Sequence, residues 1–263
     1  EAAGVVAEIG EGVEGFKVGD RVVGSTMLVG GFCERVLVKA SATRKLPDNL
    51  GFAESTGILY AYGTGYYGLK YRGGLKAGET LLVLGAAGNV GLAAVELGKL
   101  MGAKVIAAAS SAEKLSVCRD RGADEVINYS REDLKTRAKE LTDGKGVNVI
   151  YDCSGGDWAE SALRAIAWEG RFLVIGFTAG IPKLPLNLTL LKSCQVIGVF
   201  YGAMVQKQPD LRDEIARDLD AMASEGRLHP YVSARYSLAE GPQALRARLD
   251  RKVTGKVVVE PNR

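Results

Sequence analysis

The sequence has few of the residues that build metal centres and disulfide frameworks. His229 is the only histidine among the 263 residues, and it lies in a turn-like context before Pro230. This scarcity excludes a multi-histidine metal site and disfavours acid/base catalysis by histidine. The 4 cysteines stand far apart and form no CxxC pair, so the sequence predicts neither a zinc cluster nor disulfides, and free thiols fit a reducing compartment. We expect no metal.

Net charge and long apolar runs are also lacking. The 34 basic and 31 acidic residues give a net charge of +3 without a basic block, so nucleic acid and membrane surfaces have little electrostatic reason to bind. No apolar run reaches the length of a membrane span, and no signal segment opens the chain. The sequence therefore predicts a cytoplasmic protein with a small-molecule ligand. Because it starts at Glu1 directly in a strand-like pattern, we also expect a missing N-terminal segment.

Glycine is abundant, and from Thr80 onward short apolar runs alternate with helical stretches that end at glycines. The expected strands are 80–84, 104–109, 125–128, 147–151, 172–175 and 195–199. The expected helices are 90–100, 112–121, 131–142 and 158–168. Strands that are apolar on both faces and alternate with helices are typical of a parallel sheet covered on both sides. The pattern predicts an α/β fold with a Rossmann-type doubly wound sheet.

The sequence on either side of this region has a different character. Residues 1–47 contain β-type runs between glycine turns, at 5–9, 21–23 and 34–38. Two helical stretches, 211–224 and 238–249, and a closing strand at 256–259 follow Pro209. We therefore predict a nucleotide-binding domain inserted in a β-rich domain. The expected boundaries are 1–59 for the first part of the β-rich domain, 60–205 for the insertion and 206–263 for the return.

A strand, a turn of small residues and a helix follow one another at 81–91. The turn matches GxGxxG with Ala86 in place of the first glycine. Gly88 lets the backbone approach a pyrophosphate, Gly91 lets the helix pack close to the strand, and the helix N-terminus attracts the phosphate charge. The alternative, that these small residues serve only helix packing, stays open. The predicted pyrophosphate-binding residues are Ala87, Gly88, Asn89, Val90 and Gly91.

The end of the second strand indicates which nicotinamide cofactor binds. Domains that bind NAD place an acidic residue there against the ribose 2′-hydroxyl. This strand instead ends in Ser110 and Ser111, and Lys114 follows. These side chains can donate to a 2′-phosphate, which favours NADPH. Alternatively, the serines cap the next helix and Lys114 is a surface charge, and capping is compatible with phosphate binding.

Several segments resemble one family, and together they extend over essentially the whole chain. They are AAGNVGLA (86–93), SAEKL (111–115), GAD (122–124), VINY (126–129), YD (151–152), GG (155–156), VGDRV (18–22), YGTGYY (62–67) and TGKV (254–257). In these segments the chain resembles the zinc-independent quinone oxidoreductases of the medium-chain dehydrogenase/reductase superfamily. The resemblance implies a GroES-like substrate domain around the Rossmann domain, with substrate and nicotinamide meeting between them. It also implies a homodimer that pairs through the last strand of the Rossmann sheet, here 195–199.

The resemblance also implies roles for individual residues. Thr64 would lie beside the nicotinamide ribose or ring, and Tyr129 near the adenosine 2′-phosphate. The nicotinamide end would be lined by Ile175, Gly176, Phe177, Thr178, Phe200 and Tyr201. Phe200 can instead be a core residue and Tyr129 a half-exposed aromatic at a strand end. Asn89 stands where the family has glycine, and we expect it to keep the turn because asparagine tolerates left-handed backbone. No catalytic residue is assigned.

The zinc-dependent alcohol dehydrogenases of the same superfamily carry cysteines that this chain lacks. Their four-cysteine loop is replaced by 25–31 and Cys33, and their later catalytic cysteine has no counterpart in 53–57. The sequence therefore predicts a metal-independent, NADPH-dependent reductase of quinones or α,β-unsaturated carbonyl compounds. Two alternatives stay open, namely an enoyl-thioester reductase and a non-catalytic NADPH-binding protein.

Overall fold

The computed structural model describes residues 1–26, 30–250 and 253–261. The chain divides into two compact units. Unit 1 combines residues 1–60 with 216–263, and unit 2 is the continuous segment 61–215. Within the described ranges, no helix is both long enough and apolar enough to cross a membrane.

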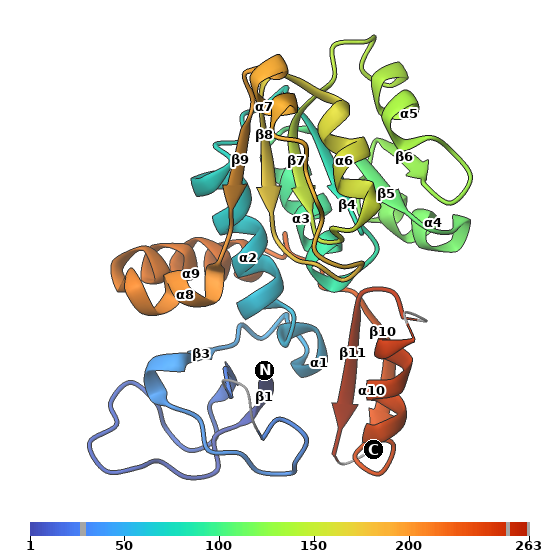
Figure 1. Cartoon of the computed structure of the whole chain (residues 1–263). Coiled ribbons are helices and arrows are strands. Elements are labelled where there is room, and N and C mark those ends of the chain that lie inside the picture. Colours follow the sequence, from blue (N-terminus) through green and yellow to red (C-terminus); the bar gives the residue numbers. More distant parts are fainter. Residues whose placement is uncertain (27–29, 251–252, 262–263) are drawn as a thin grey trace. The chain divides into compact units, whose positions relative to one another are not determined.

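Unit 2 is built on a six-stranded sheet with the order β6-β5-β4-β7-β8-β9, in which all neighbours are parallel (Figure 1). Its strands are β4 (Thr80–Leu84), β5 (Lys104–Ala109), β6 (Glu125–Asn128), β7 (Val147–Asp152), β8 (Ile166–Val174) and β9 (Gln195–Gly198). The strand order reverses direction between β4 and β7, which makes the sheet doubly wound. The carboxyl ends of these two strands form the switch point at which such sheets bind ligands. The predicted α/β class and doubly wound sheet are confirmed.

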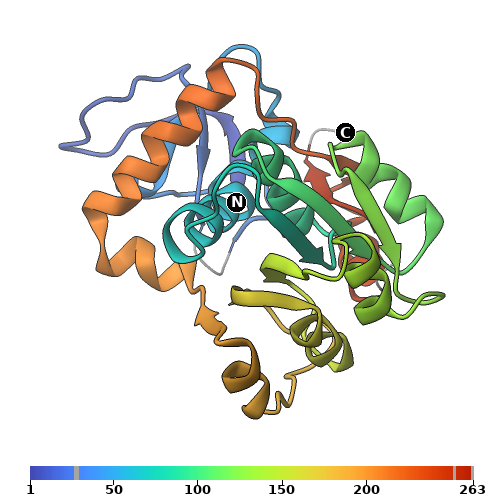
Figure 2. The same cartoon turned by 90° about the horizontal axis from the view of Figure 1, so that it is seen from above.

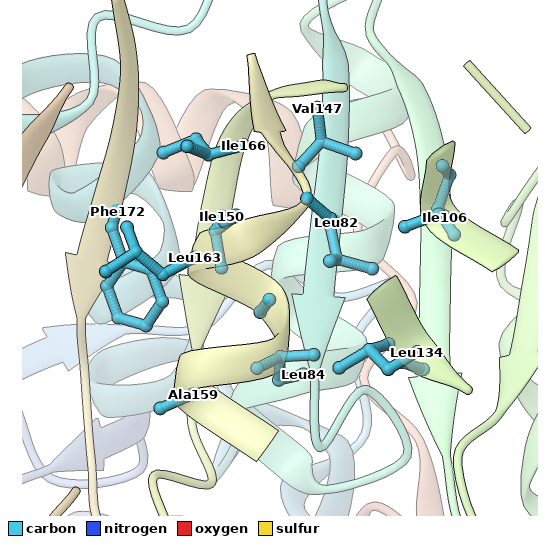
Figure 3. Packing of buried hydrophobic residues seen from close by; sticks show 14 of the residues in the cluster. Leu82, Leu84, Ile106, Leu134, Val147, Ile150, Ala159, Leu163, Ile166 and Phe172 are labelled. Carbon is cyan, nitrogen blue, oxygen red and sulfur yellow. The ribbon is translucent and has the colours of Figure 1, made fainter. Parts of the chain in front are cut away.

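Helices cover both faces of this sheet (Figure 1 and Figure 2). They are α2 (Gly63–Tyr66), continued by the helical turn η3 (Tyr67–Arg72), α3 (Asn89–Leu100), α4 (Ala112–Asp120), α5 (Leu134–Glu140), α6 (Asp157–Arg164) and α7 (Asn187–Lys192). Helix α8 (Tyr201–Lys207) follows β9 beyond its carboxyl end. Leu134 of α5 and Leu163 of α6 pack against Leu82, Ile150 and Phe172 of the sheet (Figure 3). The sheet is therefore fixed by apolar burial, and its strand ends are free to carry a site.

The predicted helix 158–168 is wrong in its second half. Helix α6 ends at Arg164, and residues 166–168 already belong to β8. Ile166 pairs with Val147 of β7 and is fully buried. A short apolar run such as 166–168 has the same sequence pattern in a buried helix and in a buried strand. Here it forms a strand because it pairs with β7.

Unit 1 contains two small sheets. An antiparallel sheet joins β1 (Ala2–Val5), β2 (Arg21–Gly24) and β3 (Thr43–Lys45), and a parallel pair joins β10 (Val232–Ser237) and β11 (Lys256–Glu260). The helical elements of unit 1 are η1 (Ala40–Ala42), α1 (Phe52–Ser55) and α10 (Gly241–Leu249). Two more helical elements, η2 (Ile58–Tyr62) and α9 (Pro209–Ser224), cross the boundaries between the units. Distant parts of the chain are tied together here, since Lys256 Nζ donates to the Glu1 carboxylate at 2.6 Å and to the Thr56 carbonyl at 2.7 Å.

Two of the strands expected in the first part of the chain are wrong. The run 5–9 belongs to a strand only at Val5, the last residue of β1, and the run 34–38 forms no strand. Leu37 is 97% exposed, and none of the strands in the described ranges pairs with this run. A strand forms only where a neighbour satisfies its backbone groups, so alternation alone was an insufficient signal.

Candidate cofactor site and pocket

The turn between β4 and α3 contains glycines with different structural roles. Gly85 has a left-handed backbone, with φ of 66°. A side chain at Gly91 would bring its Cβ to 2.7 Å from the Ala86 Cα, so close contact of helix and turn requires glycine there. At Gly88 the only atom of the described residues within 4 Å of a Cβ is the Gly85 carbonyl oxygen at 3.4 Å, and Gly88 is exposed. The protein's own atoms therefore explain Gly91, whereas Gly88 faces space that a ligand can enter.

Helix α3 begins at Asn89, and no side chain caps it. An uncapped N-terminus presents free N–H groups and the positive end of the helix dipole, which together suit a phosphate. Asn89 has helical rather than left-handed backbone, so the expected reason for tolerating asparagine is wrong. The left-handed position is Gly85, which the motif-based prediction missed although a glycine directly precedes the motif. The turn and the helix end fit a pyrophosphate group.

The predicted 2′-phosphate residues come together at the carboxyl ends of β5 and β6. Ser111 caps α4 by accepting the Lys114 N–H, and Lys114 Nζ lies 3.3 Å from the Ser110 Oγ. Tyr129 follows β6, and its N–H donates to the Ala109 carbonyl at 3.2 Å. The Tyr129 ring packs on Trp158 with 5.1 Å between the ring centroids. Ser111 therefore caps α4, as the alternative interpretation expected. The capping still leaves the Lys114 ammonium group close to the serine hydroxyls.

Two charged residues at this end of β5 were not predicted. The Ser111 hydroxyl donates to the Glu113 carboxylate, and this hydrogen bond lowers the pKa of Glu113, with a smaller contribution from the nearby Arg131. The carboxylate is thus ionised, and the guanidinium of Arg131 offsets its charge. Arg131 belongs to the loop after β6, so only the spatial neighbourhood reveals that it stands near the first turn of α4.

Asp152, at the carboxyl end of β7, organises the loop that follows. Asp152 is 2% exposed, and its carboxylate accepts hydrogen bonds from the N–H groups of Ser154 at 2.8 Å and Gly155 at 2.9 Å. Burial raises the pKa of this carboxyl, and the two N–H donors oppose that rise. The Asp152 carbonyl also accepts the N–H groups of Ile175 and Gly176. Both carboxylate and carbonyl are occupied in holding loops, and this residue has a positioning role.

A pocket of about 640 Å³ opens at the carboxyl ends of β8 and β9. It is lined by Tyr67, Arg72, Val174, Ile175, Phe177, Gly198, Val199, Phe200, Ala203, Met204, Lys207 and Gln208. Its size is that of ordinary small-molecule sites, and its walls are mainly apolar. Phe200 is 76% exposed, which rules out the alternative that it belongs to the core.

The pocket includes only part of the set expected at the nicotinamide end. Ile175, Phe177 and Phe200 line it, whereas Gly176, Thr178, Tyr201 and Thr64 do not. Thr178 donates to the Cys153 carbonyl at 3.3 Å. Tyr201 lies against Gly63 next to Thr64, and its ring is 6.3 Å from that of the pocket residue Tyr67.

Tyr151 lies beneath this wall and carries an unsatisfied hydroxyl. Its side chain is fully buried, and its oxygen has no hydrogen-bond partner among the described residues. The ring approaches Gly68, which Val199 and Ile175 of the pocket wall also approach. Burial raises the pKa of this phenol well above its ordinary value.

The last strand of the sheet, β9, has an exposed edge. Val196 at its middle is 43% exposed, whereas Val199 is 7% exposed and belongs to the pocket wall. At the expected apolar edge strand, Val196 is therefore the exposed valine, whereas the Val199 side chain packs inside unit 2. Within the described ranges, no group of three His, Cys, Asp or Glu side chains is placed to hold a metal ion.

Comparisons with known proteins agree with this geometry. Residues 1–68 match a family model described as alcohol dehydrogenase GroES-like domain, and residues 89–223 match one described as zinc-binding dehydrogenase. The quinone oxidoreductase-like protein 2 homolog of Nematostella vectensis is 40% identical over 98% of this chain and 72% of its own length. The chain belongs to the quinone oxidoreductase-like family of the medium-chain dehydrogenase/reductase superfamily. The predicted family and the GroES-like part of the fold are thereby confirmed.

Solved structures of this family share the fold. The Escherichia coli quinone oxidoreductase, determined in complex with NADPH, is 30% identical and superposes with a TM-score of 0.88 over 98% of this chain and 80% of its own. The CurK enoyl reductase is 28% identical, with a TM-score of 0.87 over 98% of this chain and 77% of its own.

Proposed function

We propose that this protein is an NADPH-dependent oxidoreductase that reduces a quinone or an α,β-unsaturated carbonyl compound without a metal ion. The observation that carries the proposal is the position of two features on one edge of one sheet. The open turn at Gly88 follows β4, and the apolar pocket follows β8 and β9, so both lie at the carboxyl edge of the sheet. Figure 1 shows the common direction of these strands. Ligands of open α/β sheets bind at this edge.

The residues present fit NADPH. The pyrophosphate would be held at the uncapped start of α3 by Ala87, Gly88, Asn89, Val90 and Gly91. The 2′-phosphate would be held by Ser110, Ser111, Lys114 and Tyr129. The nicotinamide end would be lined by Thr64, Ile175, Gly176, Phe177, Thr178, Phe200 and Tyr201. The solved Escherichia coli relative with bound NADPH supports this choice of cofactor.

When bound, NADPH supplies a hydride equivalent, and quinones and enones are electrophilic enough to accept it without a Lewis acid. The chain contributes position and the exclusion of water. Val174, Val199 and Met204 form apolar walls against which a flat conjugated acceptor can pack. No acid or base of this chain is assigned to the step. We further propose that residues 1–59 with 206–263 act as the substrate domain and 60–205 as the cofactor domain.

The proposal is tested by following NADPH oxidation at 340 nm with a panel of quinones and enones, with NADH as the cofactor control. We expect turnover with NADPH and the same rate after treatment with a chelator. Loss of activity on chelation, restored by zinc, would overturn the metal-independent reading. Binding of NADPH without turnover of any acceptor would identify a non-catalytic binding protein instead.

The similarity to the CurK enoyl reductase supports a second candidate function, the reduction of enoyl thioesters. An enoyl thioester in the same panel distinguishes the two. A kcat/KM for the thioester that exceeds the values for all quinones would favour the second function.

A further inference from the structure

The pocket at the ends of β8 and β9 has walls of one charge sign. Among the residues that the structure describes, Arg72 and Lys207 are its only charged lining residues, and no aspartate or glutamate lines it. The rest of the lining is apolar or neutral, with the aromatic rings of Phe177 and Phe200 among it. A ligand that fills such a pocket has an apolar body and gains from carrying a negative charge.

The two cations are available to a ligand. Arg72 is exposed and donates through Nε to the Gly198 carbonyl at 3.1 Å, which holds its guanidinium at the end of β9. That bond leaves the two terminal nitrogens of Arg72, which make no other hydrogen bond or ion pair with the described residues. Lys207 is exposed at the end of α8 and forms no salt bridge within the described ranges.

Acidic groups near the pocket are directed elsewhere. Glu214 of α9 accepts the Tyr71 hydroxyl at 2.7 Å. Asp210, near the start of α9, interacts electrostatically with Arg212, whose pKa is raised mainly by its hydrogen bond to Asp213. Neither acidic side chain lines the pocket, so the positive charge of Arg72 and Lys207 is not cancelled inside it.

We infer that this pocket selects acceptors that carry an anionic group, such as a carboxylate or a sulfonate, on an apolar conjugated body. The inference rests on the proposed reductase function and adds the substrate class to it. Arg72 provides planar hydrogen-bond donors suited to a carboxylate, and Lys207 adds a second positive charge. Both are specificity-determining residues in this assignment, and the apolar walls hold the electrophilic ring.

The test compares a benzoquinone that carries a propanoate side chain with the methyl ester of the same compound. The saturated side chain keeps the two quinones equally electrophilic, so a difference in kcat/KM reports the charge. We expect kcat/KM to be about five- to thirty-fold higher for the acid at low ionic strength, mainly through KM, and the ratio to fall with added salt.

Variants assign this preference to the pocket. Lys207→Gln and Arg72→Gln should each lower the acid-to-ester ratio about threefold or more, and Arg72→Lys should restore part of it. Lys135→Gln is the matched control, because it removes the same charge from α5, which packs beside β6 at the opposite end of the sheet from β9. The control should leave the ratio unchanged.

Two results would overturn the inference. One is a kcat/KM ratio of acid to ester of one or less, and the other is a ratio that does not change in Lys207→Gln and Arg72→Gln. In either case, turnover of the ester still supports the proposed function, so the two claims fail separately. If neither compound is turned over, calorimetric binding of the same pair without NADPH decides the inference. Equal affinities for acid and ester would then refute it, and tighter binding of the acid would support it.

Discussion

Gly88 and Gly91 stand three residues apart in one turn, and substitutions at the two positions should have opposite consequences. A Cβ at Gly88 meets only the Gly85 carbonyl oxygen, at 3.4 Å, and the φ of −75° and ψ of 165° suit any residue. A Cβ at Gly91 would lie 2.7 Å from the Ala86 Cα, and a backbone atom cannot rotate away. Gly88→Val should therefore spare the fold and damage the cofactor site, and Gly91→Ala should damage the fold.

The magnitudes follow from these contacts. For Gly91→Ala, forcing the turn away from the helix should cost about 1–3 kcal/mol, as for other overpacked sites. In a domain of this size that lowers Tm by about 2–4 °C for each kcal/mol. For Gly88→Val, the folded state gains no clash and the unfolded chain loses freedom, so the free energy of unfolding should change by less than about 1 kcal/mol. The valine methyl groups occupy the space assigned to the pyrophosphate, so NADPH affinity should fall at least tenfold, or by about 1.4 kcal/mol.

The assay needs both quantities on the same samples. Thermal unfolding without cofactor gives the stability of each variant, and titration of NADPH fluorescence gives its affinity. A folded Gly88→Val protein that binds NADPH as tightly as the parent would refute the assignment of the pyrophosphate to this turn. A Gly91→Ala protein as stable as the parent would show that the close approach of helix and turn is not needed.

Four further outcomes are expected. Lys114→Ala should weaken the binding of NADPH by about 1–3 kcal/mol and leave the Kd for NADH nearly unchanged, and equal loss for both would refute the 2′-phosphate assignment. Val196→Lys, on the edge strand β9, should shift the expected homodimer toward monomer in light scattering, unless the parent protein is itself monomeric, which would contradict the pairing. Tyr151→Phe should stabilise the protein by about 1 kcal/mol in urea unfolding, because the buried hydroxyl has no partner among the described residues. Since burial raises the pKa of this phenol, the unfolded chain ionises first and the parent should lose stability above about pH 10, a loss that the phenylalanine variant should reduce. Burial raises the pKa of Cys118 to about 12, so iodoacetamide at pH 8 should modify Cys33 well before Cys118, and equal rates would contradict this.

The parallel sheet could be predicted closely because its strands are buried on both faces. Strands 80–84, 104–109 and 125–128 have the predicted bounds, since each is a short apolar run between helical segments. Prediction failed where pairing, and not a long apolar run, decides the structure. The strand β10, residues 232–237, alternates apolar and polar residues and was not predicted, and it is stabilised by pairing with β11. Conversely, 34–38 was predicted as a strand but pairs with none of the strands in the described ranges.

Parts of the candidate site could likewise be predicted from the sequence, and other parts could not. The turn at 85–91 is local, so its motif is readable from the sequence, although the left-handed position Gly85 was missed. The pocket walls combine η3, the ends of β8 and β9, and α8, so nothing in the sequence around Arg72 or Lys207 indicates that the two residues share a pocket. Arg131 was missed for the same reason, because it meets Glu113 only through folding.

The division of the chain into units has a consequence for biosynthesis. Unit 2 is one continuous segment, 61–215, whereas unit 1 needs residues from both 1–60 and 216–263. Bonds such as that between Lys256 and Glu1, whose positions differ by 255, form only after Lys256 has left the ribosome. Residues 1–60 are made before unit 2 but wait for residues 216–263, while the six-stranded sheet of unit 2 can already assemble. A nascent chain arrested once residue 215 has emerged from the ribosome should therefore contain a folded nucleotide-binding unit attached to an unfinished first segment that is open to proteases and chaperones.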